Sequence, residues 1–200
     1  MAYRNIIFDI GNVLLNWRPE RVIQTTFPNH PDPASYAKNI FNHADWVDFD
    51  RGTHSEAEIQ NLLCTRLNIK AEQATLLTEI VKTSLSPKHE TIALLHELKA
   101  QGYDLYCLTN MSGECFEFIQ AKYDFWPLFT HITVSGYVKL VKPDPAIYHH
   151  ALDINHLKAN ETIFIDDIVE NVQGAESVAI TGIHFTDFNS VNARLKQLLG

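Results

Sequence analysis

The chain has 200 residues, of which 46% are hydrophobic and 20% charged, so it can form a sizeable core and is not disordered. Its 16 Lys and Arg residues against 24 Asp and Glu residues give a formal net charge of −8, which argues against nucleic acid or an anionic membrane surface as the main partner. Three cysteines form neither an even set nor a C-x-x-C motif, so we expect reduced thiols rather than disulfides or a zinc site.

The N-terminal apolar run lacks a basic head and a cleavage site, and no stretch approaches the ~20 apolar residues of a membrane span. We therefore expect a cytoplasmic protein. Residues 3–8 predict a buried strand that ends at a carboxylate. The block from 17 to 86 then has helical spacing throughout, apart from a proline-rich loop at 28–33. Ser55 and Glu58 form a capping box before one of its helices, and a further helix covers 71–84.

Beyond this block the pattern changes to short apolar strands alternating with helices. Ser86-Pro87 is typical of an N-cap followed by proline, so we expect a helix over 87–100 that ends at Gly102. Strands are predicted at 104–109, 131–135, 162–166 and 183–186, and helices at 112–122, 144–153, 169–178 and 190–199. The fold class is therefore α/β: a Rossmann-like parallel sheet with helices on both faces, formed by 1–16 and 87–200, and an inserted all-helical cap at 17–86.

Polar side chains follow the predicted strands where a parallel sheet binds its ligands. These are Asp9, Thr109 with Asn110, Lys142, and Asp166 with Asp167. Each alone is also compatible with a helix cap, a turn or a surface loop. Their coincidence at one sheet edge favours a site, and the clustered carboxylates there would repel one another without a cation between them.

Four segments carry a resemblance to a known family: FDIGNV (8–13), LTN (108–110), VKPDPAIY (141–148) and FIDDIVEN (164–171). Their order and spacing resemble the four motifs of the haloacid dehalogenase (HAD) superfamily, whose helical cap falls where 17–86 lies. The D-x-G-N-V form of the first motif and Arg51-Gly52 in the cap resemble the bacterial alpha-D-glucose-1-phosphate phosphatase subgroup. The resemblance implies a phosphatase acting on a small phosphorylated metabolite such as a sugar phosphate.

The resemblance also implies a role for each motif. Asp9 is the expected nucleophile and forms an aspartyl-phosphate. Lys142 neutralises the phosphate and restrains Asp9, while the Thr109 hydroxyl and the Asn110 N–H bind phosphate oxygens. Mg²⁺ is the expected cofactor because it prefers oxygen ligands. Its expected ligands are the carboxylates of Asp9, Asp166 and Asp167 and the Gly11 carbonyl. Asn171 is expected to orient Lys142 or a water on the metal.

Gly11 departs from the common superfamily pattern, which has a second Asp there as general acid. General acid catalysis contributes roughly 10²–10⁴-fold to the reaction rate, so the loss of the acid must be explained. Three explanations are possible. The substrate has a good leaving group such as an anomeric oxygen, which we favour; or a cap residue or water replaces the acid, with His43 and His54 as candidates; or the activity is low and phosphate binding is the role.

Trp17, Arg18, Trp46 and Arg51 either line a substrate pocket under the cap or form the interface between cap and core. A 2-haloacid dehalogenase is the closest rival function, but that chemistry needs no metal, so the Asp166-Asp167 pair argues against it. A weakly active phosphate-binding regulatory module is the rival from another class. We expect a small phosphorylated substrate, no nucleic acid or membrane partner, and a monomer or small homo-oligomer.

Overall fold

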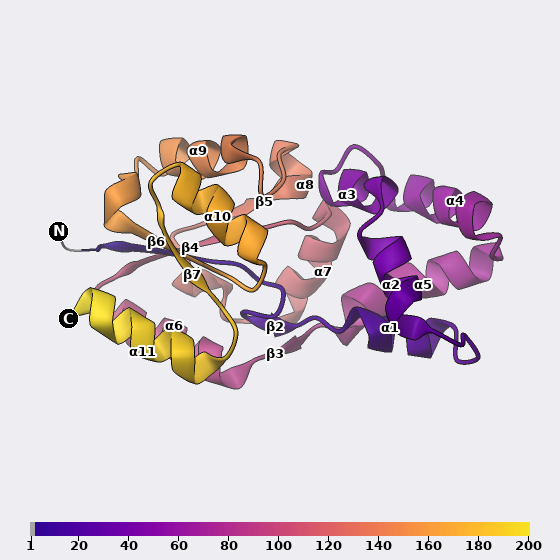
Figure 1. The fold of residues 1–200 in the computed structure, drawn as a ribbon, viewed down its shortest axis with the longest axis horizontal. Helices are drawn as coiled ribbons and strands as arrows, with labels where there is room; N and C mark the ends of the chain where they lie inside the picture. The colour runs from indigo at the N-terminus through magenta and orange to yellow at the C-terminus, as the bar shows by residue number, and fades with distance from the viewer. Residues whose placement is uncertain (1–2) are drawn as a thin grey trace.

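The computed structural model describes residues 3–200 and contains a parallel β-sheet between two layers of helices, with a group of helices beside it (Figure 1). The sheet has the order β5-β4-β1-β6-β7, and all its neighbouring strands are parallel. Its strands are β1 (Asn5–Phe8), β4 (Asp104–Thr109), β5 (His131–Val134), β6 (Thr162–Asp166) and β7 (Thr181–His184). The predicted α/β class is confirmed.

Alternate residues of each central strand face opposite helical layers, as the period of two requires. Ile6 and Phe8 pack with α6 (His89–Ala100), α7 (Gly113–Lys122) and α11 (Phe188–Leu199). Ile7 packs instead with α9 (Pro145–Ile154) and α10 (Val169–Ser177), which lie on the other side of the sheet in Figure 1. Three short elements complete this part: η1 (Trp126–Leu128), α8 (Ser135–Val138) and η2 (Ala159–Glu161). Because both faces are covered, the strands are buried and read as continuous apolar runs.

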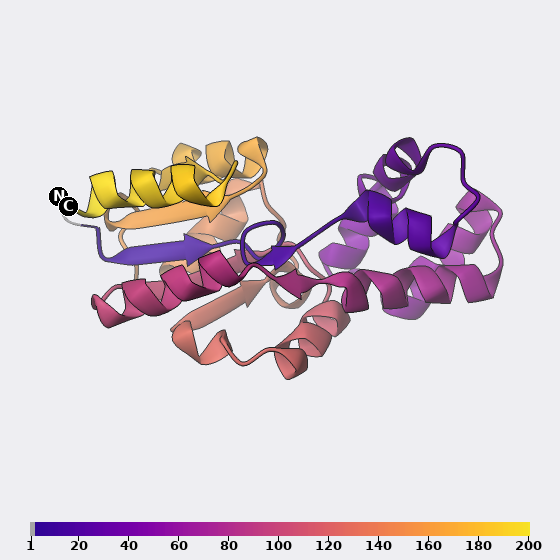
Figure 2. The same cartoon turned by 90° about the horizontal axis from the view of Figure 1, so that it is seen from below.

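Five helices form the group beside the sheet, which Figure 2 shows as a separate mass reached by two chain crossings. They are α1 (Pro19–Thr26), α2 (Pro33–Phe41), α3 (Ala44–Asp50), α4 (Glu56–Leu67) and α5 (Ala71–Ser84). The capping box predicted at Ser55 and Glu58 is present at the start of α4. All five helices fall within 17–86. The domain boundaries themselves, 1–16 with 87–200 and 17–86, stay predictions.

The two crossings pair with each other, and this pairing overturns one prediction. Ser86-Pro87 does not begin a helix; it forms β3 and pairs antiparallel with β2 (Leu15–Asn16). The Lys88 N–H donates to the Leu14 carbonyl at 2.8 Å, so α6 begins only at His89. Pro87 has no N–H to donate, and its place in an edge strand of a two-stranded sheet does not require one.

Other boundaries differ by one or two residues. The last strand is Thr181–His184 rather than 183–186, and α2 already begins at Pro33, where the Asp32 side chain caps it. Cys64, Cys107 and Cys115 are free thiols, as predicted. Within residues 3–200, no helix combines the length and the apolar character needed to cross a membrane.

Candidate active site

The register of the three central strands brings the separate motifs together. Phe8 of β1 lies level with Cys107 of β4 and Ile165 of β6. The next residue, Asp9, continues the ladder by donating its N–H to the Ile165 carbonyl at 2.9 Å. Asp9 therefore emerges between the ends of β4 and β6, where Thr109 and Asp166 also lie. The predicted convergence at one sheet edge is present.

Lys142 connects the motifs through a fully buried ammonium group. Its Nζ lies 2.7 Å from Asp9 Oδ1, 2.6 Å from Asp166 Oδ2 and 3.0 Å from the Leu108 carbonyl oxygen, which uses all three of its N–H donors. Burial opposes the charge, but the Asp166 and Asp9 carboxylates outweigh it and raise the pKa of Lys142 above its ordinary value. Lys142 is thus a fixed positive charge between two carboxylates.

The main chain of Lys142 is fixed by Asn110. The Asn110 amide donates to the Lys142 carbonyl at 2.9 Å and accepts the Lys142 N–H at 2.8 Å. Thr109, one residue earlier, is buried at the end of β4 and lines the same cavity as Asp9. The side chain of Asn110 therefore positions the lysine, a contact that sequence reasoning did not foresee, while its N–H remains the group predicted for phosphate.

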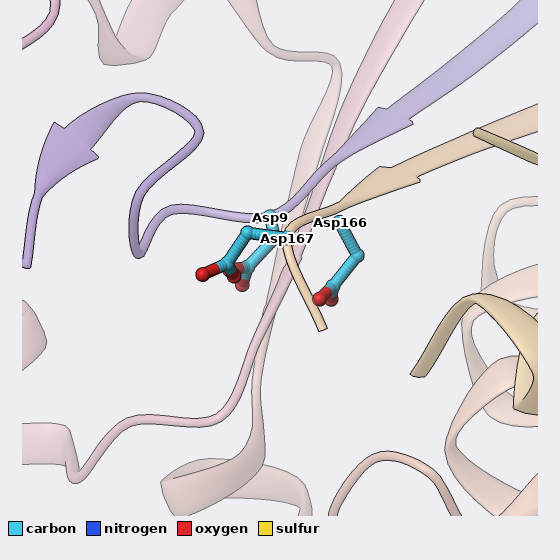
Figure 3. A group of neighbouring side chains, drawn as sticks. All are labelled: Asp9, Asp166 and Asp167. Atoms are coloured by element: carbon cyan, nitrogen blue, oxygen red, sulfur yellow. The ribbon is translucent and has the colours of Figure 1, made fainter. Parts of the chain in front are cut away.

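The two carboxylates after β6 differ in their surroundings. Asp166 is fully buried, and both its oxygens accept hydrogen bonds: Oδ1 from the Ile168 N–H at 2.8 Å, Oδ2 from Lys142, and each from Asn171 Nδ2 at 3.1 Å. Asp167 accepts from Asn12 Nδ2 at 2.9 Å. Figure 3 shows Asp9 and Asp167 on one side of the segment that leaves β6 and Asp166 on the other. Of the two carboxylates after β6, Asp166 is therefore the one that pairs with Lys142. Asn171 contacts Asp166, so it orients Lys142 only indirectly.

Three carboxylates together suit a hard divalent cation. One oxygen each from Asp9, Asp166 and Asp167 lies within 4.8 Å of the others. Burial raises the pKa of Asp9 to about 7, with Lys142 opposing and Asp166 and Asp167 adding to the shift. Burial also raises the pKa of Asp167. Lys142 alone therefore does not keep the cluster fully ionised at neutral pH, and a further cation would.

Gly11 lies in the tight loop after Asp9. Its carbonyl accepts the Val13 N–H at 2.7 Å, and the loop continues through Asn12, which has a φ of 52°. The Asn12 side chain accepts the Trp17 N–H at 3.0 Å while it donates to Asp167. Through Asn12, the loop that follows Asp9 is therefore bonded both to Asp167 and to Trp17, which lies just before α1.

A cavity of about 270 Å³ lies over these residues, between the sheet edge and the helices. Asp9, Gly11, Thr109, Asn110, Lys142, Asp167 and Asn171 line it from the sheet edge. From the helical side, Trp17, Phe41, Asn42, Trp46, Val47, Phe49, Asp50, Val81 and Leu85 line it. A larger open cleft of about 470 Å³ adjoins α1 and α5, but it contains none of the four motifs, so we place the site in the smaller cavity.

The aromatic and basic residues predicted either to line a pocket or to form the interface between cap and core divide into two groups. Trp17 and Trp46 line the cavity, whereas Arg18 lines the larger cleft and Arg51 pairs with Asp48. His43 caps α3 and pairs with Asp45, and neither it nor His54 is among the cavity-lining residues of the described chain. The cavity lining therefore offers no support for either histidine as the replacement for the missing acid.

Asp50 is the acidic residue that sequence reasoning missed. It ends α3, lines the cavity from the helical side, and accepts a hydrogen bond from the Ser112 N–H of the opposite wall. Burial raises the pKa of Asp50 well above its ordinary range, and the Ser112 contact only partly offsets this. In the sequence, the one feature that could have drawn attention to Asp50 is that it directly precedes the Arg51-Gly52 pair.

Comparisons with known proteins agree with this geometry. A family model described as haloacid dehalogenase-like hydrolase matches residues 3–178. The chain is 30% identical to the sesquiterpene phosphatase astK of Aspergillus oryzae over 199 residues, covering 100% of this chain and 98% of that protein. It is 26% identical to the drimenol cyclase drtB of Aspergillus calidoustus, covering 98% of this chain but 37% of that protein.

Two solved structures have the same fold. A HAD family enzyme of Bacteroides thetaiotaomicron, in complex with magnesium and inorganic phosphate, gives a TM-score of 0.77 at 20% identity, covering 95% of this chain and 99% of that one. The L-2-haloacid dehalogenase of Xanthobacter autotrophicus, with chloropropionic acid covalently bound, gives a TM-score of 0.69 at 14% identity, covering 98% and 83%.

Proposed function

This chain belongs to the haloacid dehalogenase-like hydrolases, and from that premise we propose that it is a Mg²⁺-dependent phosphatase acting on a small phosphate monoester through an aspartyl-phosphate at Asp9. The observation that carries the proposal is the buried Lys142, which bridges Asp9 and Asp166 at the floor of a cavity that Asp167 also lines. The phosphatase named among its relatives and the neighbour that binds magnesium and phosphate support this assignment.

In the first step, an Asp9 carboxylate oxygen attacks phosphorus while the bond from phosphorus to the ester oxygen breaks. Lys142 holds Oδ1 of Asp9 and supplies positive charge beside the phosphate. The Thr109 hydroxyl and the Asn110 N–H bind phosphate oxygens. In the second step, water attacks the aspartyl-phosphate, which releases inorganic phosphate and restores Asp9.

The donor set fits Mg²⁺, and Asp9 and Asp167 are its principal ligands in this proposal because Asp166 is occupied by Lys142, Asn171 and the Ile168 N–H. Asp166 and the Gly11 carbonyl complete the ligand set predicted from the resemblance. When bound, the metal supplies the charge that offsets the phosphate and the clustered carboxylates.

Removal of divalent cations tests this assignment. We expect EDTA treatment followed by desalting to abolish phosphate release, and added Mg²⁺ to restore it. The measurement is inorganic phosphate released from p-nitrophenyl phosphate, alongside chloride released from 2-chloropropionate. Undiminished turnover in EDTA, or chloride release without phosphatase activity, would instead indicate the 2-haloacid dehalogenase chemistry.

We assign the missing general acid to Asp50, which faces the cavity from α3. Its raised pKa leaves it able to give a proton to the departing alkoxide and then to accept one from the attacking water. This replaces the acid absent at Gly11 and makes a good leaving group unnecessary.

Asp50→Asn should lower kcat by roughly 10²-fold or more on alkyl phosphates, and much less on p-nitrophenyl phosphate, whose leaving group needs no proton. Stability should respond in the opposite sense. Because the pKa of Asp50 is raised on folding, its ionisation destabilises the native state as pH rises above the ordinary value of 3.8. The variant should therefore gain stability relative to wild type as pH rises above about 4. Equal losses of kcat on both esters would assign Asp50 a purely structural role.

Three of the predictions from sequence concern the location, the oligomeric state and the substrate. The cytoplasmic location and the monomeric or small homo-oligomeric state stay predictions. The sugar-phosphate substrate also stays a prediction, although the lining of the cavity bears on it directly.

A further inference from the structure

The wall of the cavity opposite the phosphate site is apolar. Apart from Asn42 and Asp50, every lining residue from the helical side is a hydrocarbon or aromatic side chain. The aromatic rings form a continuous edge-to-face series: Trp17 to Phe41 at 5.1 Å between centroids, Phe41 to Trp46 at 4.7 Å, and Trp46 to Phe49 at 5.5 Å. Such packing holds the rings as a rigid surface.

The wall of the cavity on the sheet side is also apolar around the phosphate site. Met111, Cys115 and Ile168 line the cavity there, and Ile168 is 49% exposed in the loop after β6. Burial raises the pKa of the Cys115 thiol to about 12, so this group is a neutral apolar contact rather than a thiolate.

The polar groups of the cavity are largely engaged by the protein. Asp9, Thr109, Lys142 and Asp167 belong to the phosphate and metal site. Asn110 is paired with the Lys142 main chain, and the Ser112 hydroxyl accepts the Cys115 N–H as the cap of α7. Asn171 donates its amide N–H groups to Asp166. This leaves Asn42, Asp50, the Asn171 amide oxygen and the indole N–H groups of Trp17 and Trp46, which are few and dispersed, to meet the several hydroxyls of a sugar. A buried hydroxyl without a partner is unfavourable, whereas a hydrocarbon gains from the same surface.

Resting on the phosphatase function proposed above, we infer that the substrate is a phosphate monoester of an apolar alcohol, with its hydrocarbon chain or ring against Trp17, Phe41, Trp46 and Phe49. This inference replaces the sugar phosphate predicted from sequence with a different leaving group. Alkyl alcohols are poor leaving groups, so such a substrate also needs the proton that Asp50 supplies.

A homologous series of n-alkyl monophosphates from ethyl to decyl, with glucose 1-phosphate alongside, tests the inference by Mg²⁺-dependent phosphate release. We expect kcat/KM to rise about fourfold per methylene until the cavity is filled, the factor that corresponds to hydrocarbon transfer from water. Glucose 1-phosphate should be poorer than octyl phosphate by at least about tenfold.

A matched pair of variants locates the effect. Phe41→Ala should flatten the chain-length dependence and lower the octyl-to-ethyl ratio of kcat/KM at least about tenfold, because it removes the ring that joins Trp17 to Trp46 in the aromatic series. Phe118→Ala truncates an aromatic side chain on α7 that is 38% exposed and outside the cavity, and should leave the ratio unchanged. The same flattening in both variants would overturn the assignment of the wall.

A binding measurement separates this inference from the proposed reaction. Asp9→Asn titrated with ethyl and octyl phosphonate in Mg²⁺ should show tryptophan emission changes from Trp17 and Trp46, with tighter binding of the longer chain. Hydrolysis of all esters at similar rates, or a preference for glucose 1-phosphate, would overturn the apolar substrate and leave the phosphatase intact. Release of phosphate from none of the esters would contradict the phosphatase, and the titration would then still decide whether the cavity takes an apolar chain.

Discussion

Asp9→Asn should reduce phosphate release by at least ~10³-fold, because the amide oxygen is a poor nucleophile at the one position that continues β1 into the cavity. The substitution keeps the shape of the side chain. Lys142 retains its bonds to Asp166 and to the Leu108 carbonyl, so we expect the fold to persist. The measurement is single-turnover phosphate release with Mg²⁺ and ethyl phosphate.

The stability of the same variant has a pH dependence with a definite sign. Burial, with the neighbouring carboxylates, raises the pKa of Asp9 to about 7, so ionisation of Asp9 destabilises the native state increasingly as pH rises towards and through that value. Removal of the charge should therefore make Asp9→Asn at least as stable as wild type above pH 7 in the absence of metal. Asp104→Asn, at the opposite and exposed end of β4, serves as the control and should change neither property. Full activity of Asp9→Asn would disprove the assignment of Asp9 as the nucleophile.

Lys142→Met should cost both activity and stability. The substitution has similar length but leaves the buried Asp9 and Asp166 carboxylates without their cation, and loss of one partner of a buried ion pair costs roughly 3–5 kcal/mol. Phosphate release should also fall to background because the phosphate loses its fixed positive charge. Urea unfolding and phosphate release measure the two effects.

A surface lysine provides the contrast. Lys158 pairs with Glu161 but its side chain is 73% exposed, so Lys158→Met should change the unfolding free energy by no more than about 0.5 kcal/mol. The deficit of Lys142→Met should shrink as pH falls, since burial already raises the pKa of Asp9, loss of Lys142 removes the charge that lowers it, and the carboxyl becomes neutral by protonation. A deficit that is independent of pH would indicate loss of packing rather than loss of charge pairing.

The positions of Asp9, Thr109, Lys142 and Asp166 at one edge followed from sequence because parallel strands end at the same side of a sheet. Each of these residues lies next to an apolar run or within a recognisable motif. The register of the strands then places the residues that follow them side by side, since Phe8 lies level with both Cys107 and Ile165. Local patterns and topology were sufficient for this part of the site.

The parts that sequence reasoning missed depend on contacts between distant segments. Asp50 faces the cavity only because α3 packs against the loop that begins α7, and no periodicity reports that contact. Ser86-Pro87 has the local chemistry of a helix start, but its pairing with Leu15–Asn16 determines its structure. Trp17 and Trp46 were predicted either to line a substrate pocket or to form the interface between cap and core, and only their packing with Phe41 from a further segment places them on the cavity wall.

The central place of β1 has a consequence for how the chain acquires its structure. Strand β1 precedes every other sheet strand, yet both its partners come much later: Asn5 pairs with Asp104 on one side and with Thr162 on the other. The five intervening helices contact mainly one another and require neither partner. During synthesis we therefore expect the helices to form first, while β1 waits unpaired until β4 and then β6 emerge. Asp9 reaches its place beside Lys142 and Asp166 only when β1 has paired with β6, so we expect the chain to become competent for chemistry late in folding rather than gradually.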